Sequence, residues 1–163
     1  MKKLVECVPN ISEGNDLSVI NKIVETVEKY PGIKLLNVDP GKATNRTVIT
    51  FVGDADIIVD AAFKLISKAK ELIDMRKHFG EHPRMGAVDV CPLIPISGIS
   101  MEETINLAHK LSHRVGKELS IPVYCYENAA KENKRKNLAN CRAGEYEGLE
   151  NKFKDSLWKP DYG

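Results

Sequence analysis

The chain has 163 residues, which predicts a single domain over residues 1–163, because domains usually contain about 100–200 residues. Hydrophobic residues make up 42% and charged residues 29% of the sequence, a balance that excludes collagen, coiled coil and low-complexity disorder. The 24 basic and 23 acidic residues leave a net charge of +1. A nucleic-acid partner is therefore not expected, since proteins that bind one usually carry a basic excess.

Neither a membrane span nor a signal peptide is expected. No run approaches the ~18 apolar residues of a span, and Glu6 and Pro9 interrupt the N-terminal apolar stretch before it reaches the ~7–15 residues of a signal core. The cysteines show no close spacing, and three of the four lie within apolar runs. We expect a soluble, cytoplasmic protein with no membrane contact, whose cysteines are reduced thiols.

Hydrophobic periodicity predicts the order strand, helix, strand, strand, helix, strand over residues 2–96. The expected strands are 2–8, 33–38, 47–52 and 87–96, the helices are 16–30 and 56–75, and a turn covers 39–42. A third helix is expected over 101–119, where Ser100 and Glu103 have the spacing of a capping box. A fifth strand at 122–126 and a polar helix from residue 128 follow.

This order predicts an α+β fold, a ferredoxin-like βαββαβ sandwich extended by a further α-β pair. Right-handed crossovers would place the helices on one face of a mixed sheet. The other face would be left uncovered, which is a reason to expect a partner.

The loop over residues 75–86 is the strongest candidate for chemistry. It contains two histidines, one glutamate and three basic residues, more than a turn needs. A neutral imidazole at His82, beside Glu81 and Arg84, suits a general acid or base, although a histidine that caps a turn would have the same neighbours. Arg46 and Arg84 offer planar donors for substrate carboxylates, and the alternative for both is a surface ion pair.

Two histidine pairs resemble metal sites only superficially. Residues 78–82 match the H-x-x-E-H pattern of inverted zinc peptidases, but that chemistry needs a continuous helix. Gly80 and Pro83 disfavour one. His109 and His113 lie one helical turn apart without a carboxylate or cysteine to complete a site, which favours a solvated helix face. No metal is expected.

Basic residues recur between positions 131 and 142. Such a run is usually one solvated helix face, and its functional alternative is attraction of a polyanionic tail on a cofactor. The residues are Lys131, Lys134, Arg135, Lys136 and Arg142.

Several long segments resemble the N-terminal subdomain of glutamate formiminotransferase. In vertebrates that transferase is the front half of formiminotransferase-cyclodeaminase. The segments are LVECVPNISEG, DPGKATNRTVITFVG, GEHPRMGAVDVCPLIP, IPVYCYENAA, RAGEYEGL and the final WKPDYG. The resemblance runs from Leu4 to Gly163. It implies transfer of the formimino group of N-formimino-L-glutamate to N5 of tetrahydrofolate, a co-substrate, in histidine degradation and one-carbon metabolism. It also implies that His82, in GEHPRMG, is the catalytic residue.

The residues fit that reaction type. The attacking amine must lose a proton and the departing glutamate nitrogen must gain one, and one histidine can serve both steps through a tetrahedral intermediate. Asp39 would orient His82 or polarise the amine, and Arg46 and Arg84 would hold substrate carboxylates. Asn10 and Asn45 would bond the pterin or the formimino group.

The resemblance also implies an incomplete site. The family's transferase has two subdomains with tetrahydrofolate between them, whereas this chain stops at Gly163. We therefore expect it to need a C-terminal subdomain in trans, or to pair with a second copy of itself. A non-catalytic ligand-binding or interaction module that keeps the subdomain fold is the alternative. Formylglutamate stays open as the donor.

Overall fold

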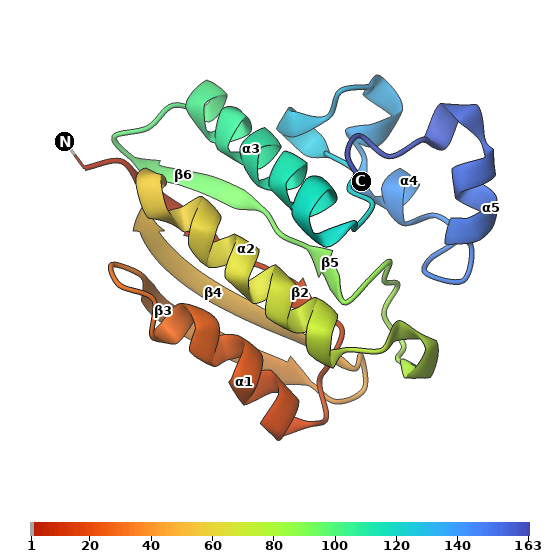
Figure 1. Ribbon diagram of the computed structural model, residues 1–163, viewed down its shortest axis with the longest axis horizontal. Helices are drawn as coiled ribbons and strands as arrows, with labels where there is room; N and C mark the ends of the chain where they lie inside the picture. The colour runs from red at the N-terminus through yellow and green to blue at the C-terminus, as the bar shows by residue number, and fades with distance from the viewer. Residues whose placement is uncertain (1) are drawn as a thin grey trace.

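One antiparallel sheet organises the first two-thirds of the chain (Figure 1). The computed structural model describes residues 2–163. Its strands are β1 (Leu4–Cys7), β2 (Asn10–Ile11), β3 (Lys34–Gly41), β4 (Arg46–Asp54), β5 (Val88–Val90) and β6 (Leu93–Ser97). The long strand β4 pairs with β3 along one edge and with β2 and β1 along the other, and β5 and β6 then pair with β2 and β1.

The expectation of a mixed sheet is wrong, because every strand pairing among residues 2–163 is antiparallel. The reason lies in the crossovers. β1 and β3 run parallel, but β4 lies between them; β4 and β6 run parallel, but β1 lies between them. Each helical connection thus skips one strand, so parallel strands are never neighbours.

Three long helices accompany the sheet: α1 (Leu17–Glu28), α2 (Ala55–Leu72) and α3 (Met101–Leu119). They lie side by side in Figure 1, and α2 contacts both of its neighbours as well as β1 and β4. The Asp16 side chain caps α1 by accepting from the N–H groups of Ser18 and Val19. The predicted capping box of α3 is confirmed, as are its bounds.

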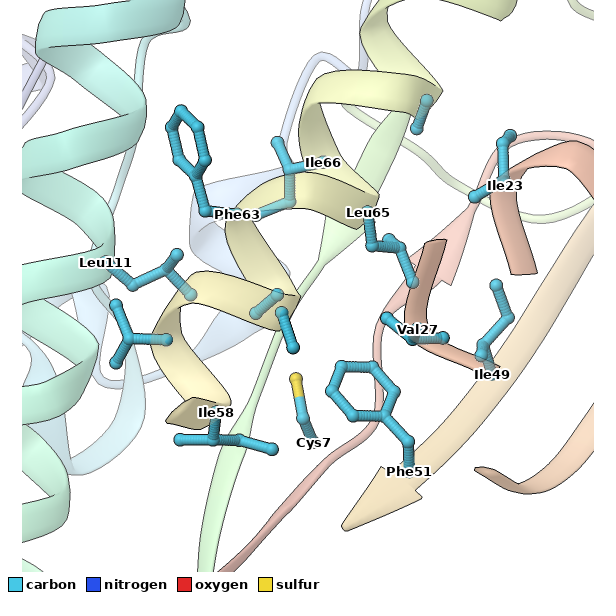
Figure 2. Close-up of a cluster of buried hydrophobic side chains, with 14 of the residues drawn as sticks. Cys7, Ile23, Val27, Ile49, Phe51, Ile58, Phe63, Leu65, Ile66 and Leu111 are labelled. Carbon is cyan, nitrogen blue, oxygen red and sulfur yellow. The ribbon is translucent and has the colours of Figure 1, made fainter. Parts of the chain in front are cut away.

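The core fills the space between these helices and one face of the sheet (Figure 2). Ile49 and Phe51 of β4 are fully buried there, together with Cys7 of β1 and Leu65 of α2. Each such apolar side chain contributes roughly 1.5–3 kcal/mol when it leaves water. Because side chains alternate along a strand, Arg46 and Val48 of β4 project from the opposite face.

Proline and hairpin geometry shift several strand ends from their expected positions. Within the expected strand 2–8 the structure forms β1, which ends before Pro9, and a further strand that was not expected, β2, follows that proline. The expected strand 87–96 divides into β5 and β6 around Pro92, because proline has no N–H to donate to a ladder. Residues 39–41, expected in a turn, extend β3 instead. The turn follows at 42–45, where Asn45 has φ of +48°.

The expected strand at 122–126 does not join the sheet. Val123 makes only an isolated bridge with Tyr162, and the Cys125 N–H donates to the Asp161 carboxylate at 2.8 Å. The C-terminal residues thus take the donors that a sheet would need. The expected polar helix is also broken, into the short helices α4 (Leu138–Arg142) and α5 (Leu149–Lys154) with three 3₁₀ turns.

The segment of residues 120–163, hereafter the C-terminal segment, folds beside α3 (Figure 1). Over residues 2–163 the structure contains no helix with the length and apolarity that crossing a membrane requires.

Candidate functional site

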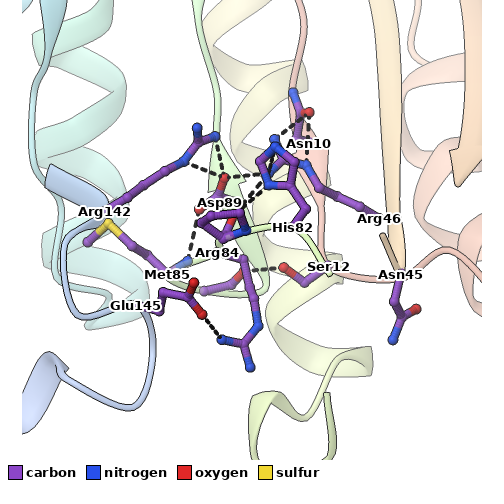
Figure 3. Close-up of polar contacts among 12 residues, drawn as sticks. Asn10, Ser12, Asn45, Arg46, His82, Arg84, Met85, Asp89, Arg142 and Glu145 are labelled. Atoms are coloured by element: carbon purple, nitrogen blue, oxygen red, sulfur yellow. Dashed lines mark hydrogen bonds and ion pairs between the residues drawn. The ribbon is translucent and has the colours of Figure 1, made fainter. Parts of the chain in front are cut away.

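Three loops meet at one end of the sheet face that the helices leave open (Figure 3). They are the residues around 10–15, the β3–β4 turn and the loop 75–87. Ser12 joins the first to the third, since its N–H donates to Ala87 O at 2.9 Å and its hydroxyl to Gly86 O at 2.7 Å. The Glu81 N–H donates to Ala43 O at 3.2 Å and joins the third to the second. Backbone bonds therefore position the side chains of the site.

His82 is half-buried and lies at the centre of these loops. Its Nδ1 is 2.7 Å from Pro83 O and 2.5 Å from Arg46 Nη1. The carbonyl pairs with a protonated Nδ1, whereas the guanidinium donates to an unprotonated one. Each neutral tautomer of the ring therefore has a partner at Nδ1, as a group that both accepts and returns a proton requires.

All three guanidinium nitrogens of Arg46 make hydrogen bonds, and the residue is 9% exposed. Its Nε and Nη2 donate to Asn10 Oδ1 at 3.3 and 2.7 Å, and its Nη1 donates to Asp89 Oδ2 at 3.0 Å and to Pro83 O at 3.2 Å. Burial lowers the pKa of Arg46, and the Asp89 carboxylate opposes that shift. Asn10 thus orients a guanidinium that contacts His82 directly.

Asp89 is a part of the site that sequence reasoning did not identify, and Arg142 was expected only as one member of a run of basic residues. The Asp89 side chain is fully buried, and its Oδ2 accepts from Arg142 Nε and Nη2 at 3.1 and 2.6 Å as well as from Arg46. Its Oδ1 accepts from the Met85 N–H at 2.8 Å. The available signal was an aspartate within the apolar run AVDVCPLI, since buried carboxylates require partners.

Arg84 lies away from His82 and has other partners. Its side chain is 6% exposed and donates to Glu145 at 2.9 Å and to Glu147 at 2.7 and 2.8 Å. Its Nε donates to His78 Nδ1 at 3.0 Å. The hydrogen bonds that Arg84 donates to the Glu147 carboxylate raise the pKa of Arg84 and lower the pKa of Glu147 to about 2. These contacts favour a structural role for Arg84.

Asn45 also serves the loops, and it points away from His82 in Figure 3. Its Oδ1 accepts from the Gly14 N–H and from Asn15 Nδ2, both at 2.9 Å, and its Nδ2 donates to Phe79 O at 2.9 Å. The buried His78 adds a bond from Nε2 to Asn45 O at 2.7 Å. The side chain of Asn45 therefore joins two loops of the site.

Asp39 lies on the open face of the sheet, in the same cross-strand row as Asn10. Val48 separates them, because it pairs with Asp39 on β3 and with Asn10 on β2. Directly paired residues share a face. Asp39 is exposed, and its carboxylate makes no hydrogen bond to any of residues 2–163.

The zinc-peptidase pattern does not form a helix. Residues 78–82 are irregular, and both ring nitrogens of His78 bond to other groups of the protein. Between residues 2 and 163 the structure contains no group of three or more histidine, cysteine, aspartate or glutamate side chains arranged to hold a metal ion. His109 contacts Tyr162 Oη at 3.2 Å, and His113 lies edge-on to the same ring.

The basic residues of the C-terminal segment do not form one solvated helix face. Arg135 is buried against Asp161, and Lys131 and Lys134 lie over the rings of Tyr162 and Trp158. Arg142 alone of the five reaches the site, through Asp89.

Comparison with known proteins gives one consistent result. Residues 4–163 match the family model described as "Formiminotransferase domain, N-terminal subdomain". The chain is 52% identical over 163 residues to the formimidoyltransferase-cyclodeaminases of Dictyostelium discoideum and Rattus norvegicus, covering 100% of this chain and 30% of each relative. It is 46% identical to the glutamate formimidoyltransferase of Streptococcus pyogenes serotype M1, covering 54% of that protein. The chain thus spans between about a third and about a half of the length of these relatives.

Proposed function

The chain belongs to the formiminotransferase family as an N-terminal subdomain, and on this premise we propose that it supplies the catalytic histidine for formimino transfer from N-formimino-L-glutamate to N5 of tetrahydrofolate. The family predicted from the sequence motifs is confirmed, and the relatives are named as transferases. The observation that carries the proposal is the position of His82, half-buried on the open sheet face with Arg46 against Nδ1.

In the proposed reaction His82 moves one proton twice. It accepts the proton that the attacking amine loses as the new C–N bond forms at the formimidoyl carbon. It returns that proton to the glutamate nitrogen as the old C–N bond breaks and glutamate leaves. The partners at Nδ1 support this role, because either tautomer of His82 keeps a hydrogen bond there.

The other predicted residues divide by their contacts. We assign Asn10 and Arg46 to the orientation of His82, and Asp39 to the substrate side of the open face, one residue row from the arginine. Contact between Asn10 and the pterin or formimino group stays a prediction. Arg84 and Asn45 are assigned to the loop scaffold, because their polar groups already bond to protein groups.

A second subdomain, with tetrahydrofolate as co-substrate between the two halves, is part of the proposal. Two observations support it. The chain covers only 54% of the length of a related glutamate formimidoyltransferase, and the open sheet face exposes the apolar side chains of Ile94 and Ile96. The strand order is in keeping with the ferredoxin-like arrangement, if β1 with β2 and β5 with β6 are each counted as one strand. We also propose a cytoplasmic location, which suits four free thiols.

The test is a transfer assay with the purified chain, alone and with the remaining part of a full-length relative added. We expect His82→Ala to lower kcat by about 10²–10⁴-fold, the usual contribution of an acid or base. His113→Ala, on an exposed face of α3, is the matched control. Formylglutamate in place of formiminoglutamate tests donor specificity. Undiminished transfer by His82→Ala would refute the proposed role, and no transfer by wild type with the added part would favour a non-catalytic module.

A further inference from the structure

We propose that Arg142, held by Asp89, is the residue of this site that binds a carboxylate of the substrates. The inference rests on the proposed function for the identity of the ligands, and on the geometry of the site for the role of the residue. Both candidate ligands, the formimino donor and the glutamate tail of the folate, would present a carboxylate to Arg142.

The first argument is geometric. Arg142 belongs to α4, in the C-terminal segment, yet its Nε and Nη2 converge on Asp89 Oδ2, the atom that also accepts from Arg46. Arg46 in turn contacts His82. Arg142 is therefore separated from the catalytic imidazole by one carboxylate and one guanidinium (Figure 3).

The second argument concerns unused donors. Both hydrogens of Arg142 Nη1 lack a hydrogen-bond partner among residues 2–163, whereas the arginine's other two nitrogens contact Asp89. The side chain is 19% exposed, so these donors remain accessible. A planar guanidinium that is already fixed on one edge presents its other edge in a defined orientation, which suits a carboxylate.

The third argument is charge. Two guanidiniums share one carboxylate, so the group of Arg46, Asp89 and Arg142 keeps one positive charge in excess. Asp89 is fully buried and Arg46 nearly so, and positive charge with little access to water favours an anionic partner. A substrate carboxylate would neutralise this excess positive charge.

The other arginines that could serve are more deeply buried than Arg142 and are bonded to protein groups. Arg84 bonds to two glutamates and to His78. Arg135 pairs with Asp161 in the interior at 2.5 Å. Arg46 donates from Nε and Nη2 to Asn10 Oδ1, and from Nη1 to Asp89 and to Pro83 O. Arg142 is left as the accessible arginine of this cluster.

The test is titration calorimetry of the purified chain, in the presence of the remaining part of a full-length relative, with N-formimino-L-glutamate and, separately, with tetrahydrofolate. We expect Arg142→Gln to weaken binding of one of them by about 10–100-fold, the range for a charged hydrogen bond. The ligand that loses affinity identifies the source of the carboxylate. Arg142→Lys keeps the charge without the planar fork and should recover only part of the affinity.

Controls separate this role from folding and from catalysis. Lys136→Gln, an exposed cation of the same segment, should bind both ligands as wild type does, and melting temperatures report any loss of structure. His82→Ala should bind but not transfer. Unchanged affinity of Arg142→Gln for both ligands, or no binding of either by wild type, would overturn the inference. Binding that depends on Arg142 without transfer, even with the second part added, would instead refute the proposed function.

Discussion

The loop that contains His82 has a glycine two residues before it, at Gly80, because no side chain would fit at that position. A Cβ atom built on Gly80 would lie 2.2 Å from Thr44 O and 2.8 Å from the Thr44 carbonyl carbon, both backbone atoms. The loop therefore approaches the β3–β4 turn more closely than any side chain permits. This contact, with the bond from Asn45 Nδ2 to Phe79 O, places the loop that carries the imidazole.

We predict that Gly80→Ala lowers kcat by about 10²-fold, the effect of misplacing a reacting group by about 1 Å. The reason is that the methyl group forces the two loops apart, and His82 moves with its loop. Steady-state kinetics of the chain with the second part added measure the change. Gly86→Ala is the matched control, because its Cβ would meet only Val88 O at 3.8 Å. Wild-type kcat in Gly80→Ala would contradict this account.

At the residue scale the sequence could indicate the chemistry of the site but not its contacts. His82 stands out because its loop holds more titratable groups than a turn needs. Arg46 and Arg84 look equivalent in the sequence, and only the fold separates them, since Glu145 and Glu147, more than 60 positions from Arg84 in the chain, bond to it. Asp89 and Arg142 meet across 53 positions, a distance that no local pattern reports.

At the scale of the elements, the sequence predicts correctly those helices whose caps and apolar stripes lie within the helix itself. α3 has the expected bounds, because its capping box and apolar stripe lie within the helix itself. The strand predicted at 122–126 is wrong because its apolar residues contact the C-terminal residues and α3 rather than the sheet. An apolar run joins a sheet only if its backbone N–H groups are not already bonded to acceptors elsewhere in the chain, as those of Val123 and Cys125 are here.

We predict that the capping box of α3 makes stability depend on pH below about 5. Hydrogen bonds from Lys3 and the Ser100 N–H lower the pKa of Glu103 from 4.5 to about 2. A carboxyl whose pKa falls on folding stabilises the protein above its unfolded pKa, and that contribution disappears as pH falls from about 4.5 towards 2. Thermal unfolding of wild type and Glu103→Gln across pH 2–7 measures it, and their melting temperatures should converge at the acid end. A constant difference at every pH would contradict it.

At the scale of the whole molecule, the C-terminal segment is attached to the rest by separate polar contacts. A cavity of about 810 Å³ lies between this segment, α3 and the strands β5 and β6. Two ion pairs join the segment to the rest of the chain, Arg142 with Asp89 and Glu147 with Arg84. Within the segment, Asp161 accepts from Arg135 Nη1 at 2.5 Å and from the Cys125 N–H, and both charged side chains are almost fully buried. The position of Arg142 in the site therefore depends on a buried pair of the same segment that is not itself part of the site.

We predict that Asp161→Asn loosens the C-terminal segment and weakens carboxylate binding without changing any residue of the site. Removing one partner of a buried pair costs about 3–5 kcal/mol, and Arg135 Nε already lacks a partner in the interior. Hydrogen exchange should therefore quicken in residues 120–163 while β4 and α2, which form the core, keep their protection. Asp155→Asn, at an exposed 3₁₀ turn of the same segment, is the control. An equal rise in exchange across the whole chain would mean that segment and core unfold as one unit. Arg142 would then owe its position to global stability rather than to this anchor.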